Sequence, residues 1–599
     1  MSAESIHGAQ DGGGTSGVGP AGAAPVGAPP PEGAPRMRIG DELLRRGLIT
    51  EEQLQLALAE QRRFHRPLGE ILVSLGFVKA IDTARLLSEQ LGIPIVSTDD
   101  LEPDPLVLES LDTNMVRAAR AFPLALDGGT LQVAMVDPTD PGSIARVRDA
   151  YPYPLSIVMI TPADLEKLLR RFQSQSSGSE VAELLSGATS EVDDRRVEEL
   201  CDAVVRDGIR RGATDIHIQP EEHLTRVRYR IDGVLRTAES LPRDVSDAVI
   251  SRVKISSRLD IAERRRPQDG RMRIAVDGRE VDLRVSVMPN VQGENLVLRV
   301  LDRTGDVPGL EELGVTSRIA DALRGLGDRP NGLFLVTGPT GSGKTTTLYS
   351  ILARVDSIQR NVATIEDPVE YSMPLVRQSQ VDGAVGYGFH EGLRALLRQD
   401  PDVILIGEIR DEVTADMAIK AAMTGHLVLA TLHTTNALGA VPRLVDLGIP
   451  AYLLEDTLVG VMSQRLVRKL CDRCTEPLVP GHPEYERTSR WLGGDIGGAM
   501  APVGCSTCDG SGFAGRIAMA ELFVPTPEVK RHIRARGGDG SLEVDALESA
   551  ALASGFLDMG HDAADKVRAG LTTLSEVLRV HVPRDVAGPR PGAEERSAA

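Results

Sequence analysis

The chain has 599 residues and a formal net charge of −19, because 67 Lys and Arg residues face 86 Asp and Glu residues. Hydrophobic residues make up 41% of the chain and aromatic residues 3%, so we expect several aliphatic cores and exclude wholesale disorder. Such an acidic chain is a poor candidate for general nucleic-acid binding, whose affinity comes from neutralising phosphates. No apolar run reaches the ~18 residues of a membrane-spanning helix, and no secretory signal is visible.

Cysteine usage indicates a metal site in a reducing compartment. Four of the five cysteines form two Cys-x-x-Cys pairs, Cys471 with Cys474 and Cys505 with Cys508, whereas Cys201 stands alone. Tetrahedral Zn²⁺ takes four thiolates from two knuckles of this spacing. We therefore predict a structural zinc ion, with unligated buried thiols as the alternative, and a cytoplasmic protein.

A short motif occurs twice near the N-terminus, at 38–61 and 67–90. Its identical pairs are Gly40/Gly69, Leu43/Leu72, Gly47/Gly76, Leu58/Leu87, Glu60/Glu89 and Gln61/Gln90. Each copy predicts a short helix, a glycine turn and a second helix that begins at Thr50 or after Val78. The simplest interpretation is a pair of helical hairpins whose glycines are C-caps.

Strand patterns follow the repeat. The runs 131–138 and 155–160 alternate with helical patterns and predict a small α/β unit that ends near residue 172. Residues 196–305 mix helices with strands such as 226–231, 280–287 and 295–301, which predicts an α+β domain. From about 306 to 470, buried apolar strands alternate with helices, the pattern of a parallel sheet.

A phosphate-binding loop lies between the apolar strand 333–336 and a helical pattern at 346–354. The sequence GPTGSGKT matches G-x-x-x-x-G-K-[ST] in its strand–loop–helix setting. Its backbone N–H groups can surround phosphates, its lysine can bind the β- and γ-phosphates, and its last threonine can bind Mg²⁺. The predicted ATP and Mg²⁺ ligands are Gly338, Pro339, Thr340, Gly341, Ser342, Gly343, Lys344, Thr345 and Thr346.

Two carboxylates are candidates for the hydrolytic chemistry. Glu408 follows the buried strand 403–406, where it can orient or deprotonate water at the γ-phosphate. Glu366, in IEDPVE (365–370), is a second carboxylate at a strand end. Two histidines, His426 and His433, flank the next apolar run and are either structural or sensors of the γ-phosphate.

Taken in order, these motifs resemble the GspE/PilB-like secretion ATPase family, which powers type II secretion and type IV pilus assembly. The resemblance rests on 338–349, 365–370, 396–411 and 424–434, and upstream on 213–220, 228–236 and 260–271. It implies a multidomain α/β protein that forms a hexameric ring. Each subunit has a RecA-like P-loop ATPase core preceded by a smaller α+β (PAS-like) domain, with ATP between the two.

The resemblance also implies roles for arginines. Arg284 and Arg299 match a pair that reaches from the smaller domain towards the phosphates and, with Lys344, Glu366 and Glu408, would be catalytic. A guanidinium on a mobile domain can stabilise the charge of phosphoryl transfer and couple it to closure. Basic residues on the RecA-like side match at Arg394, Arg398 and Arg410.

The N-terminal repeat resembles the family's tandem cyclic-dinucleotide-binding module, which makes cyclic di-GMP a possible regulatory ligand. The implied contacts are Arg38, Gly40, Leu43, Leu44, Leu58, Gln61, Gly69, Leu72 and Gln90. The second copy departs from the motif, since it begins at Pro67 rather than Arg and has Thr83 in place of a leucine. The alternative is a protein-docking module that has kept only the fold.

With this resemblance, the chain divides into eight predicted segments. They are a disordered tail (1–36), an N-terminal domain with the tandem motifs and the small α/β unit (37–172), a linker (173–195), the smaller α+β domain of the ATPase (196–305), the RecA-like ATPase domain (306–470), a zinc-binding subdomain (471–525), a C-terminal helical part (526–582) and a second disordered tail (583–599).

The leading hypothesis for function is a hexameric cytoplasmic ATPase, peripheral at the inner membrane, that couples hydrolysis to pilin or pseudopilin assembly. Its expected partners are inner-membrane platform proteins of a pilus or secretion machine, and no nucleic acid. One alternative is a nucleotide-sensing regulatory protein with little turnover. Another, a nucleic-acid translocase on the same core, conflicts with the acidic composition.

Overall fold

The computed structural model describes residues 38–582 apart from short gaps. The positions left out within that range are 65, 99–100, 102, 105–106, 109–110, 112, 177–180, 182–183, 185–193, 302–306 and 535–541. The predicted tails and most of the predicted linker lie outside the described residues. The chain forms two compact units, an N-terminal one up to Gln175, apart from Ser74–Gly76, and a larger one from Ser176 onwards.

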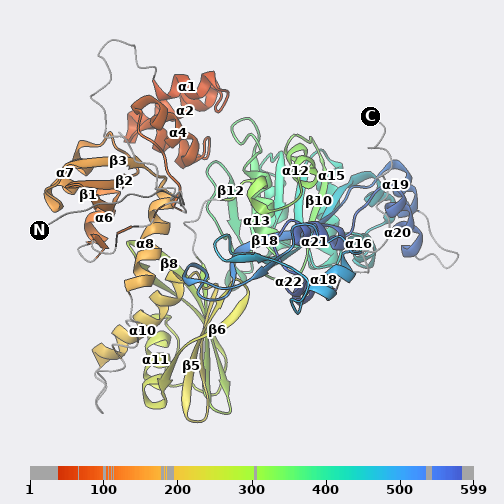
Figure 1. The fold of residues 1–599 in the computed structure, drawn as a ribbon. Coiled ribbons are helices and arrows are strands. Elements are labelled where there is room, and N and C mark those ends of the chain that lie inside the picture. The colour runs from red at the N-terminus through yellow and green to blue at the C-terminus, as the bar shows by residue number, and fades with distance from the viewer. Residues whose placement is uncertain are drawn as a thin grey trace, which may run out of the picture. The chain divides into compact units, whose positions relative to one another are not determined.

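The sequence repeat of the N-terminal unit forms two similar helix pairs (Figure 1). They are α1 (Ile39–Arg45) with α2 (Glu51–Phe64), and α3 (Leu68–Ser74) with α4 (Ala80–Leu91). Gly47 and Gly76 follow the short helices with φ of 68° and 72°, a conformation that favours glycine. The predicted pair of helical hairpins is confirmed.

The rest of this unit is a small α/β layer. Its sheet has the order β1-β2-β3, in which β1 is antiparallel and β3 parallel to β2. Apolar residues of β1 and β2 pack against α8, among them Phe122, Ala134 and Leu168. The elements are α6 (Thr113–Ala119), β1 (Ala121–Asp127), β2 (Thr130–Met135), α7 (Pro141–Ala150), β3 (Leu155–Met159) and α8 (Pro162–Ser176).

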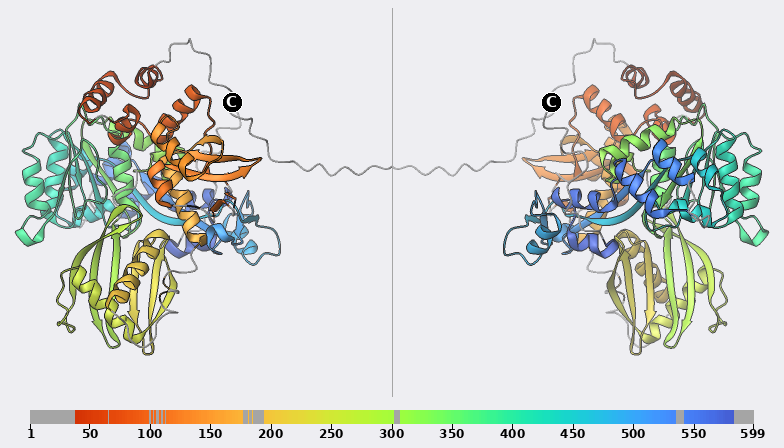
Figure 2. Two further views of the ribbon diagram at one scale, coloured as in Figure 1. Left: turned by 90° about the vertical axis from the view of Figure 1, so that its left-hand side faces the viewer. Right: turned by 90° about the vertical axis from the view of Figure 1, so that its right-hand side faces the viewer.

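The larger unit begins with an antiparallel six-stranded sheet of order β6-β5-β4-β9-β8-β7. Alternate strand residues such as Ile216, Val227 and Leu298 form one apolar face, which packs against α10 and α11 (Figure 2). The other face therefore carries the polar residues of the alternation. The elements are α10 (Asp194–Arg210), β4 (Asp215–Pro220), β5 (Leu224–Ile231), β6 (Val234–Pro242), α11 (Arg243–Ser256), β7 (Gln268–Val276), β8 (Arg279–Asn290) and β9 (Gly293–Leu301).

A seven-stranded sheet of order β12-β11-β13-β14-β10-β15-β18 follows. All neighbours pair in parallel except β15 with β18. The strands are β10 (Gly332–Thr337), β11 (Val362–Glu366), β12 (Arg377–Gln380), β13 (Val403–Ile406), β14 (Leu427–Leu432), β15 (Leu458–Leu470) and β18 (Phe513–Phe523). The predicted parallel sheet is confirmed.

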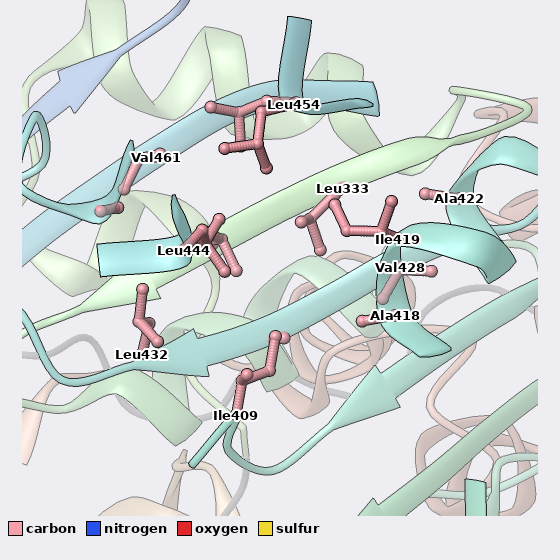
Figure 3. Packing of buried hydrophobic residues seen from close by; sticks show 14 of the residues in the cluster. Leu333, Ile409, Ala418, Ile419, Ala422, Val428, Leu432, Leu444, Leu454 and Val461 are labelled. Carbon is pink, nitrogen blue, oxygen red and sulfur yellow. The ribbon is translucent and has the colours of Figure 1, made fainter. Parts of the chain in front are cut away.

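Helices cover both faces of this sheet, which explains its uninterrupted apolar strands. Figure 3 shows Leu333 and Val428 of two strands beside Ile419 of α15, in one buried cluster. On the other face, Leu348 of α13 packs with Phe334. The helices are η2 (Leu310–Leu313), α12 (Ser317–Gly327), α13 (Lys344–Leu352), η3 (Gly383–Val385), α14 (Phe389–Leu396), α15 (Glu412–Met423), α16 (Ala440–Asp446) and α17 (Ala451–Thr457).

The cysteine pairs lie in an excursion between β15 and β18. It contains β16 (Thr475–Pro477), α18 (Tyr485–Trp491), β17 (Met500–Pro502) and η4 (Ser506–Cys508). Since β18 pairs with β15, the predicted zinc subdomain 471–525 overlaps the main sheet by one strand; the other domain boundaries stay predictions. The C-terminal helices are α19 (Pro527–Arg534), α20 (Val544–Ala553), α21 (Met559–Arg568) and α22 (Leu574–Val580).

None of the helices in the described part of the chain combines the length and the apolar character that crossing a membrane requires.

Candidate nucleotide-binding site

The parallel sheet brings the candidate catalytic segments to one edge. The glycine-rich loop follows β10, Glu366 ends β11, Glu408 lies just beyond β13 and His433 follows β14. These four strands are parallel neighbours within the sheet, so their carboxyl ends lie side by side. In open α/β sheets, this is the edge at which ligands bind.

The glycine-rich loop has the backbone geometry of an anion cradle. Gly338, Gly341 and Gly343 have φ of 142°, 77° and 84°, and a Cβ on Gly338 would lie 2.5 Å from the carbonyl oxygen of Gln464. Because α13 begins at Lys344, its first N–H groups lack partners within the helix and can bind phosphate. The Ser342 hydroxyl is buried with no partner among the described residues.

Side chains hold this loop in place from two directions. Lys344 Nζ donates to the carbonyl oxygens of Gly338 and Pro339, at 2.9 and 3.0 Å. Gln464 of β15 accepts from Thr347 Oγ1 at 2.8 Å and donates to the Ser342 carbonyl at 2.6 Å. Burial lowers the pKa of Lys344, and Glu408 and Glu370 oppose that shift. An incoming phosphate would thus meet a lysine already bent over the loop.

Glu408 lies between two basic groups. Its carboxylate is ion-paired with Arg410, and His433 Nε2 lies 3.4 Å from its second oxygen. The Glu408 side chain is 14% exposed, so it is sheltered but reachable. His426, by contrast, lies at the amino end of β14, where its Nδ1 is 2.9 Å from the Ala421 carbonyl oxygen. The prediction that both histidines line the site is wrong for His426, because a strand separates them.

Glu366 is not an open catalytic carboxylate in this structure. It is 2% exposed, accepts hydrogen bonds from Thr364 Oγ1 at 2.6 Å and Gln378 Nε2 at 3.3 Å, and is also bonded to the Tyr349 hydroxyl. Burial raises its pKa, which these donors counteract. Both carboxylate oxygens are engaged, so Glu366 ties α13 to β11 and β12 rather than facing open solvent.

Glu370, four residues later, is the carboxylate that sequence reasoning missed. Thr345 Oγ1 of the glycine-rich loop lies 3.5 Å from its Oε1. Burial raises the pKa of Glu370, as does Glu366, while Thr345, Arg299 and Lys344 lower it. Its only sequence signal was its place as the second glutamate of IEDPVE. Which of the two glutamates is buried depends on the turn after β11.

The arginines from the six-stranded sheet reach the site. Arg284 Nη2 lies 3.7 Å from Asp367 Oδ1, in the loop that carries Glu370. Together with Arg299 they line a cavity of about 570 Å³. The predicted approach of Arg284 and Arg299 to this edge therefore agrees with the structure.

The remaining arginines differ in position. Arg410 pairs with Glu408, as above. Arg394 and Arg398 are exposed, on α14 and just beyond it, and Arg398 Nη1 donates to the Arg394 carbonyl at 2.8 Å. Within the described part of the chain, no contact joins either of these two to the glycine-rich loop.

The four paired cysteines form one cluster. All four Sγ atoms lie within 4.8 Å of one another, with Cys471–Cys505 at 3.9 Å, Cys474–Cys508 at 3.7 Å and Cys505–Cys508 at 3.8 Å. A tetrahedron with Zn–S bonds of ~2.3 Å has sulfur–sulfur edges of about 3.8 Å. Backbone N–H groups of Cys505 and Gly512 donate to Cys508 Sγ, which stabilises a thiolate. The donor set fits Zn²⁺.

In the N-terminal unit, the predicted dinucleotide contacts divide by burial. Leu43 and Leu72 are fully buried in the helix packing, whereas Arg38 is exposed. Leu44, Leu58, Gly69 and Gln90 are half-buried, Gly40 is buried, and half-buried Gln61 donates to the Arg66 carbonyl. The buried leucines hold the helix pairs together, so they are not free to pack against bases in this conformation.

Comparisons with known proteins agree with this arrangement. Residues 190–579 match the type II/IV secretion system protein family, and residues 91–179 match the MshEN domain. The chain is 39% identical over 534 residues to the type IV pilus assembly ATPase PilB of Thermus thermophilus, a match that covers 87% of this chain and 59% of that protein.

A second relative is matched over nearly its whole length. The type II secretion system protein E of Xanthomonas campestris pv. campestris is 38% identical over 560 residues, 91% of this chain and 98% of that protein. A solved structure of MshE with cdg is 30% identical over 23% of this chain and 99% of that chain, with a TM-score of 0.21. The family match and the extent of the second relative show that the chain belongs to the type II/IV secretion system protein family.

Proposed function

We propose that this chain drives the assembly of pilin-like subunits by hydrolysing ATP, in a type IV pilus or a type II secretion machine. The chain is an ATP hydrolase of the secretion family. The observation that carries the proposal is the meeting of Lys344, Glu370 and Glu408 at one sheet edge with arginines from a second sheet. Relatives in both kinds of machine support the broader assignment equally.

Each residue of the site has a distinct task in this proposal. The loop N–H groups and Lys344 bind the β- and γ-phosphates. Glu408 orients or deprotonates the attacking water, and Arg410 and His433 position its carboxylate. Arg284 and Arg299 stabilise the charge that develops on the transferred phosphoryl group. Thr345 and Glu370 would hold Mg²⁺, which neutralises phosphate charge when it is bound.

The active form in this proposal is a hexameric ring at the cytoplasmic face of the inner membrane, in contact with membrane platform proteins. Arg394 and Arg398 are exposed and unattached to their own glycine-rich loop, which leaves them available to a neighbouring subunit. Hydrolysis changes the angle between the two sheets, and that movement is passed to the membrane partner.

Replacement of Glu408 and Lys344 separates the motor from a regulatory nucleotide-binding protein. We expect Glu408→Gln to lower the turnover number by about 10²-fold or more, because it removes the general base but keeps the shape of the site. Lys344→Ala should lose nucleotide affinity as well. Phosphate release by the assembled full chain measures both, with exposed Asp416→Asn as the control. A wild type no faster than the Glu408 variant would favour the regulatory alternative.

Zinc in the cysteine cluster is structural in this proposal, because four thiolates leave no open ligand position. We expect one zinc ion per chain by elemental analysis. Cys474→Ser should lose the metal and lower the melting temperature, since β16, β17 and η4 surround the cluster. Cys201→Ala, remote in the α10 core, should keep the zinc. A metal-free wild type with an unchanged melting temperature would contradict the proposal.

Cyclic di-GMP regulates the motor in this proposal, through the N-terminal repeat. The duplicated motif supports it, and the MshEN match begins directly after the second copy, at residue 91. We expect the full chain to bind cyclic di-GMP in calorimetry, and Arg38→Ala to weaken binding, because an exposed guanidinium is lost. The control is exposed Arg148→Ala on α7. Absence of binding at micromolar ligand would favour a protein-docking module.

A further inference from the structure

Four arginines and one aspartate form a single row across the polar face of the six-stranded sheet. Strand register places these residues directly opposite one another on consecutive strands β5, β4, β9, β8 and β7. Directly paired residues share a face, and here it is the face opposite α10 and α11. The row reads Arg230, Asp215, Arg299, Arg284 and Arg271.

The charges of this row are unbalanced. Asp215, whose side chain is 13% exposed, accepts from Arg299 Nε at 3.1 Å and has Arg230 Nε at 3.6 Å. The next two positions are Arg284 and Arg271. Arg284 finds its carboxylate outside the sheet, in Asp367, and Arg271 has none within 4 Å among the described residues. Like charges directly opposite each other destabilise a sheet, so three adjacent arginines indicate an anion that is missing.

The unbalanced end of the row faces the nucleotide edge. Arg271, Arg284 and Arg299 line the cavity of about 570 Å³, together with Asp215 and Asp367. Asp367 lies in the loop after β11, three residues before Glu370, whose pKa Arg299 and Lys344 both lower. The arginine row and the glycine-rich loop thus act on the same carboxylate from different elements.

We propose that the row is one binding site for the phosphates of the nucleotide, with Arg271 as a third phosphate-binding arginine and Asp215 as the carboxylate that phosphate displaces from Arg299. The proposal rests on the proposed function, since it names further residues of that site. Guanidinium groups bind phosphate oxygens in bidentate fashion, and a polyphosphate offers enough negative charge to neutralise three of them.

Asp215 is a positioning residue in this scheme. While the site is open it holds Arg299 and prevents repulsion along the row. When nucleotide enters, Arg299 exchanges one anionic partner for another, so its desolvation cost is already partly met. Asp215 therefore competes with phosphate, and its removal should have the opposite sign to the removal of an arginine.

The test measures the dissociation constant of a non-hydrolysable ATP analogue by calorimetry on the full chain. Arg271→Gln should weaken binding about tenfold, the value of one charge-assisted contact. Arg273→Gln is the matched control, because Arg273 is also on β7 but is paired with Asp282 at 2.8 Å and does not line the cavity. Equal affinities of the two variants would overturn the assignment of Arg271.

Asp215→Asn should tighten analogue binding about threefold, as expected for loss of one competing ion pair. Its KM for ATP should fall together with its turnover number, because product release slows, whereas simple structural damage would raise KM. Weaker analogue binding by a variant that melts at the wild-type temperature would overturn the role of Asp215. If Asp215→Asn does not fold, the comparison of Arg271 with Arg273 decides alone.

Lys344→Ala distinguishes this proposal from the proposed function. Loss of analogue binding in Lys344→Ala, with Arg271→Gln equal to Arg273→Gln, would refute the arginine row and leave the nucleotide site in place. Wild-type binding by Lys344→Ala would refute the nucleotide site itself, and the arginine row with it.

Discussion

The parallel pairing of β11, β13, β14 and β10 is the constraint on which the nucleotide site depends. It places four carboxyl ends at one edge, so segments up to about 100 residues apart in the chain supply one site. The apolar strands needed for this pairing are buried on both faces, and helices supply that cover. Polar chemistry is consequently confined to the loops that leave the edge.

Burial assigns different tasks to three glutamates that look alike in the sequence. Glu366 is bonded on both oxygens and fixes the base of the site. Glu370 faces Thr345 and the positive groups around the glycine-rich loop. Glu408, between Arg410 and His433, stays reachable. The environment of each carboxylate, rather than its residue type, therefore decides whether it holds structure, charge or water.

The sequence predicted well those features that local patterns determine. The glycine-rich loop needs positive φ at fixed positions, apolar runs reveal the parallel strands, and cysteine spacing indicates the metal cluster. It failed where the outcome depends on three-dimensional pairing. His426 and His433 flank one strand, yet the strand's length separates them. The alignment of Arg271 with Arg284 and Arg299 depends on the register of three antiparallel strands, which no single strand encodes.

The central claim is that an arginine from the six-stranded sheet completes a site built on the parallel sheet. The most direct measurement is the turnover number of assembled Arg299→Ala, with nucleotide affinity measured in parallel. A guanidinium that acts on the transferred phosphoryl group is worth about 10³-fold or more, so turnover should fall by that much while affinity falls far less. Turnover within tenfold of wild type would show that the parallel sheet hydrolyses ATP without this lobe.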